Sequence, residues 1–180
     1  MKATGIVRRI DDLGRVVIPK EIRRTMRIRE GDPLEIFTDK DGELIFKKYS
    51  PIGELGDFAA QMCDSLRKTT DGIAAVCDRD TVIAVSGAAK RELLDKPISA
   101  QLGDIMEKRG VYRHESGGSN LPVSVSDDKF CLSVAAPVIS EGDVMGSVLF
   151  ITPRNSPPGT EVEYKLAQNA STFLGKQMES

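Results

Sequence analysis

The sequence of 180 residues is poor in the side chains that build metal centres and disulfide frameworks. It holds one histidine, His114, and three cysteines, Cys63, Cys77 and Cys131, which are widely spaced and form no CxxC pair. Neither a zinc site nor a disulfide framework is therefore indicated, and buried core thiols are the expectation. No metal or cofactor is predicted.

Long apolar runs are absent as well. No stretch approaches the roughly 18 consecutive apolar residues that a membrane-spanning helix needs. The first residues, Met1 to Thr4, lead straight into a strand-like pattern instead of the apolar core of a signal peptide. We therefore expect a cytoplasmic protein that has no membrane partner.

The whole chain also lacks a charge excess, since 25 Lys and Arg face 27 Asp and Glu for a net charge of -2. Taken whole, this balance argues against binding to nucleic acid. Counted by segment, residues 1–29 carry nine basic and three acidic groups, or +6, whereas residues 30–50 carry -3 and residues 51–180 carry -5. Because a charged patch acts locally, the basic segment is a candidate DNA contact, and a solvated basic face is the alternative.

A domain boundary is indicated where the charge changes. Ser50 and Pro51 follow each other there, and serine is favoured as a helix N-cap while proline is favoured at the first helical position. The sequence therefore predicts two domains, residues 1–50 and residues 51–180.

The first domain has the pattern of short strands separated by turns. The expected elements are strands over 4–10 and 15–18 about Gly14, a short helix that opens at Pro19 and stops at Gly31-Asp32-Pro33, and a hairpin of 34–38 and 43–48 about Asp41-Gly42. A unit of this size is too small to bury a stable core alone, and it has no cysteine or metal staple. We therefore expect it to share strands with a second chain through a common core of Ile6, Ile10, Val17, Leu34, Ile36, Leu44 and Phe46.

The second domain mixes helices with antiparallel strands. The expected elements are a helix over 52–70, hairpins of 73–77 with 81–85 and of 132–139 with 144–152, a helix over 98–109, and a last helix that begins at the capping-box pair Thr160 and Glu163. A sheet bracketed by a first and a last helix is typical of an α+β sensory module.

Arginines are the strongest chemical signal of the first domain. Arg8 and Arg9 fall in the first expected strand, Arg15 begins the second, and Arg23 and Arg24 fall on the short helix. Guanidinium groups suit both phosphate oxygens and the O6/N7 edge of guanine. Charge alone leaves DNA contact and a solvated face equally open.

The stretch from Met1 to Met26 closely resembles the AbrB family of bacterial transition-state regulators. The resemblance is most specific in Leu13-Gly14-Arg15-Val16-Val17-Ile18-Pro19 and in Glu21-Ile22-Arg23-Arg24-Thr25. It implies a swapped-hairpin dimer that binds double-stranded DNA. It also implies that Arg8, Arg15, Arg23 and Arg24 contact the DNA, with Arg9, Lys2 and Lys20 as weaker candidates.

The whole chain resembles those AbrB-family regulators that act on sporulation genes in the forespore and carry a carboxy-terminal GAF domain. The implied fold is an all-β swapped-hairpin (AbrB-type) dimeric head plus an α+β GAF domain, and the implied assembly is a homotetramer that pairs through the GAF helices. The Asn-Lys-x-Asp-type motif of nucleotide-binding GAF domains is absent, so a nucleotide is not implied. A different small-molecule ligand stays open, as do activation and repression.

Two other functions are alternatives to a non-enzymatic transcriptional regulator. A GAF-fold thiol enzyme, such as a methionine sulfoxide reductase, needs clustered cysteines, and here they lie in different elements. An antitoxin with an AbrB-like head usually ends in a short flexible tail, whereas this chain ends in a capped helix.

Three further features carry no predicted chemistry. The small-residue segments 86–90 and 115–119 could offer backbone N–H groups to a ligand, but neither is a phosphate loop, and both are interpreted as ordinary turns. His114 has no Ser or Cys partner at motif spacing, so it is interpreted as a surface or strand-end residue.

Overall fold

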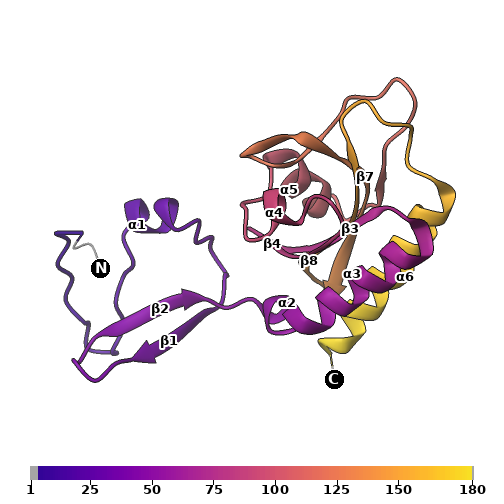
Figure 1. The fold of residues 1–180 in the computed structure, drawn as a ribbon. Helices are drawn as coiled ribbons and strands as arrows, with labels where there is room; N and C mark the ends of the chain where they lie inside the picture. Colours follow the sequence, from indigo (N-terminus) through magenta and orange to yellow (C-terminus); the bar gives the residue numbers. More distant parts are fainter. Residues whose placement is uncertain (1–3, 180) are drawn as a thin grey trace. The chain divides into compact units, whose positions relative to one another are not determined.

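The computed structural model describes residues 4–179, which form two compact units (Figure 1). The first unit ends at Tyr49 and is called the head below; the second begins at Ser50. Within the described residues, no helix combines the length and the hydropathy that crossing a bilayer requires.

Residues 4–49 of the head contain one helix and one hairpin. They are α1 (Lys20–Thr25), β1 (Leu34–Thr38) and β2 (Leu44–Lys48). The two strands pair antiparallel with Ile36 opposite Phe46, and the Asp39 carboxylate closes their turn by accepting from the backbone N–H groups of Asp41 and Glu43. The predicted hairpin about Asp41-Gly42 is confirmed, because Gly42 takes the positive φ of 81° that the turn requires.

The strands predicted over 4–10 and 15–18 are not formed in the single chain. The only described backbone bonds between these segments and their turn are Asp11 N–H to the Arg15 carbonyl and Gly14 N–H to the Asp11 carbonyl, both 3.0 Å. A strand needs a neighbour for its N–H and C=O groups, and the described residues of one chain supply none here.

Helix α1 also ends earlier than predicted. Ile28 N–H donates to the Arg23 carbonyl at 2.7 Å, the long bond of a Schellman turn, and Arg27 adopts a φ of 53°. Arg27 therefore lies after the helix, and Gly31 lies beyond its end.

The second unit is a sheet between two layers of helices (Figure 1). Its strands run in the order β4-β3-β8-β7-β5, with β6 also on β7, and every pairing is antiparallel. The strands are β3 (Ile73–Asp78), β4 (Val82–Ser86), β5 (Tyr112–Arg113), β6 (Pro122–Ser124), β7 (Asp127–Ser140) and β8 (Asp143–Pro153). The helices are α2 (Pro51–Glu54), α3 (Gly56–Thr70), α4 (Lys90–Leu93), α5 (Ala100–Glu107) and α6 (Glu161–Gln177).

Each face of the sheet has its own apolar core. Because successive strand residues point to opposite faces, Val76 and Phe150 pack with α3 and α6, whereas Ala75 and Leu149 pack with α4 and α5. All four side chains are fully buried. This three-layer arrangement confirms the predicted α+β organisation with a first and a last helix on the sheet.

Both predicted hairpins of this unit are confirmed, as are the helix within 98–109 and the capping box of α6. Thr160 Oγ1 accepts from Glu163 N–H at 3.1 Å, and a Glu163 carboxylate oxygen accepts from Thr160 N–H at 2.9 Å. The helix predicted over 52–70 is instead interrupted at Leu55, between α2 and α3. Three elements were not predicted, α4, β5 and β6, because two to four residues are too few to show a period.

Candidate nucleic-acid interface

The candidate DNA-contacting residues lie on three segments of the head. Arg8 and Arg9 are exposed on the extended segment before the Asp11 turn, Arg15 follows that turn, and Lys20 and Arg24 are exposed on α1. Arg23 is half-buried, and its Nε is buried with no hydrogen-bond partner among the described residues. Lys2 lies outside the described residues.

Asp11 organises Arg15. One carboxylate oxygen of Asp11 accepts from the backbone N–H groups of Leu13 at 3.0 Å and Arg15 at 2.7 Å, while the other pairs with Arg15 Nε at 2.8 Å. These bonds, the backbone bond from Arg15 first, hold the pKa of Asp11 below its usual value. The Arg15 side chain nevertheless remains 70% exposed, so it is oriented by the turn and still accessible to a ligand.

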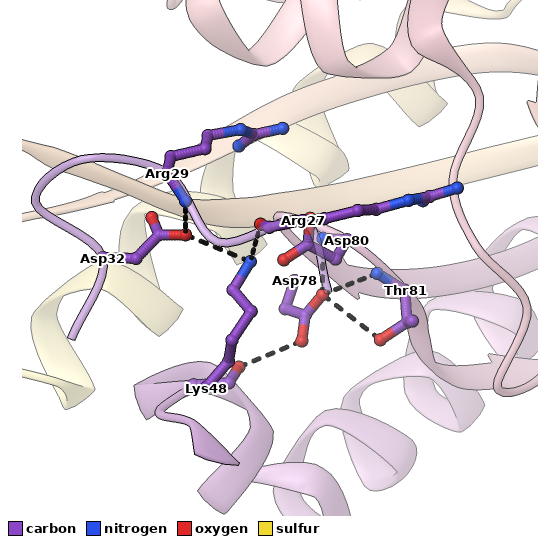
Figure 2. A network of polar contacts seen from close by, with 8 residues as sticks. Arg27, Arg29, Asp32, Lys48, Asp78, Asp80 and Thr81 are labelled. Atoms are coloured by element: carbon purple, nitrogen blue, oxygen red, sulfur yellow. Dashed lines mark hydrogen bonds and ion pairs between the residues drawn. The ribbon is translucent and has the colours of Figure 1, made fainter. Parts of the chain in front are cut away.

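The turn after α1 is tied to strand β2 by Lys48 (Figure 2). Lys48 Nζ donates to the Arg27 carbonyl at 2.9 Å and pairs with Asp32 at 3.2 Å, and the same Asp32 oxygen accepts from Arg29 N–H at 2.9 Å. The Asx-turn pattern at Asp11 is readable from Asp-x-x-Gly spacing, but the pairing of Asp32 with Lys48 has no local signal in the sequence.

The head leaves most of its large apolar side chains exposed. Of the predicted common core, Leu34 and Phe46 are half-buried, while the others are exposed in the single chain: Ile6, Ile10, Val17, Ile36 and Leu44. Val7, Leu13, Val16 and Met26 are exposed as well. The predicted core therefore does not close within one copy of the head.

The three cysteines are free and buried in the second unit, which confirms them as core thiols. Burial raises the pKa of Cys63 to about 12 and raises that of Cys77 also, so these thiols stay protonated at neutral pH. No cluster of three or more metal-ligating side chains occurs in residues 4–179.

His114 follows β5, so its strand-end placement is confirmed, but it is buried and not a surface residue. The hydroxyl of Tyr112 lies 3.4 Å from its Nδ1.

Two protein families match different parts of the chain. The family described as "Stage V sporulation protein T C-terminal, transcription factor" matches residues 54–179. The family described as "Antidote-toxin recognition MazE, bacterial antitoxin" matches residues 7–54.

Individual relatives cover the whole chain or one of its parts. Stage V sporulation protein T of Bacillus subtilis (strain 168) is 51% identical over 179 residues, which is 99% of each chain. The transition state regulatory protein AbrB of the same organism is 63% identical over 63 residues, which is 32% of this chain and 65% of that protein. The GAF domain of a phosphoenolpyruvate-protein phosphotransferase from Coxiella burnetii has a TM-score of 0.54 at 11% identity, covering 69% of this chain and 82% of that one, which shows the GAF fold.

An AbrB-type head followed by a GAF domain defines a bacterial transcriptional regulator. The chain belongs to the stage V sporulation protein T family, and it is a sporulation regulator of that kind. The antitoxin alternative is not favoured, because the antitoxin family matches the head alone whereas the sporulation relative matches from end to end.

Proposed function

We propose that the predicted first domain, residues 1–50, which contains the head, is the DNA-binding domain and that it binds double-stranded DNA through Arg8, Arg15, Arg23 and Arg24, assisted by Arg9, Lys20 and Lys2. The observation that carries this proposal is Arg15, an exposed guanidinium whose direction is set by Asp11, on a segment with a charge of +6. An oriented guanidinium loses less freedom when it meets a phosphate or a guanine edge. The 63% identity of this region to AbrB, a transition state regulator, supports the same role.

The DNA-binding form is a dimer in which two heads exchange strands. Segments 4–10 and 15–18 lack strand partners within the described residues of one chain, and the apolar side chains beside them are exposed. A second copy would supply both the missing backbone partners and the cover for those side chains.

The GAF domain, residues 51–180, pairs two such dimers into a tetramer and is the place where a small molecule would act. Helices α3 and α6 lie side by side on one face of its sheet. The ring of Phe173 on α6 packs at a tilt against that of Phe58 on α3, with 5.9 Å between the ring centroids, while Phe173 remains 46% exposed. Val162, near the other end of the same helix, is exposed as well, and exposed apolar side chains along one helix favour helix pairing.

The GAF domain has no enzymatic role in this proposal, because all three thiols are buried and burial raises the pKa of Cys63 and Cys77, which disfavours the nucleophilic thiolate there. As a regulator of bacterial transcription, the protein acts in the cytoplasm, and in the forespore by its resemblance to sporulation regulators.

A salt titration of DNA binding tests the interface. Replacing Arg15 or Arg24 with alanine should weaken binding to many sequences and reduce the slope of log K against log salt by about one for each phosphate that is no longer neutralised. Lys108→Ala, which removes an exposed cation from the second unit, is the control and should leave both quantities unchanged. Unchanged affinity and slope in the arginine variants would rule out their assignment.

A further inference from the structure

Helix α1 has few stabilising interactions of its own. It spans six residues, has no side-chain N-cap, and buries none of its residues. Isolated helices of this length are unstable in water and depend on tertiary contacts. Its orientation, and with it the direction of Arg23 and Arg24, must therefore be set by what its ends are attached to.

The carboxyl end of α1 is attached to β2 through Lys48 and Asp32 (Figure 2). The Lys48 ammonium bridges the Arg27 carbonyl and the Asp32 carboxylate, and Asp32 also receives the Arg29 N–H. Arg27, with a φ of 53°, holds a backbone conformation that non-glycine residues rarely adopt, and Lys48 binds its carbonyl. These contacts define the turn immediately after Arg23 and Arg24.

The pair of Lys48 with Asp32 is partly buried. The side chain of Asp32 is 4% exposed and that of Lys48 is 25% exposed, whereas the pair of Arg15 with Asp11 is far more open. Exposed pairs contribute little because water and salt screen them, but a shielded pair with further hydrogen bonds has a defined geometry.

We propose that Lys48 and Asp32 form a clamp that positions Arg23 and Arg24 for DNA without contributing DNA contacts of their own. Lys48 is thus a positioning residue, although its charge alone would suggest a phosphate contact. This inference rests on the proposed DNA-binding function of the head.

The sign of an affinity change separates positioning from simple electrostatics. Asp32→Asn makes the head more positive by one charge, so electrostatics alone predicts tighter DNA binding. Disruption of the clamp predicts the opposite, namely weaker binding. Glu30→Gln makes the same charge change at a neighbouring exposed carboxylate, so it is the matched control.

The test uses the full-length chain, a duplex that it selects from a random pool, and a shuffled duplex of the same composition. Asp32→Asn should bind the selected duplex about tenfold more weakly and the shuffled duplex as well as before, because misdirected arginines no longer reach the base edges but keep their charge. Glu30→Gln should bind both duplexes at least as tightly as the unchanged chain.

A second variant distinguishes loss of the clamp from a general loss of folding. Lys48→Met keeps the bond of Asp32 to Arg29 N–H and removes the ammonium that links β2 to the Arg27 carbonyl and to Asp32, so it should also lower the ratio of selected to shuffled affinity. The clamp is overturned if Asp32→Asn behaves like Glu30→Gln, or if the clamp variants weaken both duplexes equally. Arg24→Ala reports separately on the proposed function, which fails if that variant binds both duplexes normally.

Discussion

Asp11 shows how one acidic residue can serve a basic surface. It sits among the arginines of the head, yet its carboxylate directs Arg15 and closes the turn from Asp11 to Arg15 through two backbone N–H groups. From net charge alone, Asp11 would be expected to weaken DNA binding. The structure shows that it supports the orientation of the side chain that carries the proposed function.

This pairing makes the turn sensitive to acid. Because the pKa of Asp11 is lowered in the folded chain, its contribution to the turn is fully present above the ordinary carboxyl pKa and is lost as the pH falls through the lowered value. The backbone amide resonances of Leu13 and Arg15 should therefore shift together in that acidic range in an NMR titration.

Asp11→Asn is the control. Its side chain has no titratable proton, so the amide resonances of Leu13 and Arg15 should no longer shift together in the acidic range. A titration in which the parent chain and Asp11→Asn moved alike would show that another group controls the turn.

At the scale of the elements, sequence patterns correctly predicted those helices and strands whose partners lie in the same chain. The hairpin of β3 with β4 and the long hairpin of β7 with β8 follow from alternation and turn residues, because their ladder partners come next in the chain. The strands expected over 4–10 and 15–18 followed the same pattern but lack their partner, so propensity alone did not form them.

Helix α6 depends on a close approach to the sheet. A Cβ added at Gly175 would collide with the backbone carbonyl of Ile139 in β7, which cannot move without disturbing the ladder to β8. Gly175→Ala should therefore lower the free energy of unfolding of the GAF domain by about 1–3 kcal/mol in urea.

Gly103→Ala is the control on another helix of the same domain. A Cβ there would meet nothing within 4 Å, so the substitution should be neutral or stabilise by about 0.4–1 kcal/mol. Equal effects from the two substitutions would show that helix propensity, and not the contact with β7, sets the cost.

At the scale of the whole molecule, charge is distributed unevenly along the chain. The +6 segment lies at the amino-terminal end of the head, and the second domain carries -5, so an overall charge of -2 conceals a molecule with a basic end. Such a charge distribution would repel the acidic domain from DNA and attract the basic segment, which favours encounters through the arginines proposed to contact DNA.

Assembly should depend on the exposed aromatic of α6. Phe173→Glu places a charge on the face proposed to pair two dimers, and this should convert a tetramer into a dimer that still binds DNA but with lower avidity. Light scattering coupled to size-exclusion chromatography measures the change.

Val125→Glu introduces the same charge at an exposed valine of the turn between β6 and β7, and it should leave the mass unchanged. A tetramer that survives Phe173→Glu would place the pairing surface elsewhere.

Features that depend on neighbours in the chain could be predicted from the amino-acid sequence. Segment charge, turn residues, the capping box and the AbrB-like run predicted the arginine-rich head, the α+β second domain and the class of regulator. The contact of Lys48 with Asp32 and with the Arg27 carbonyl, in contrast, became known from the folded chain alone. Asp32 and Lys48 lie far apart in sequence, and such a contact has no local pattern, because it exists only once β2 has folded back beside the turn after α1.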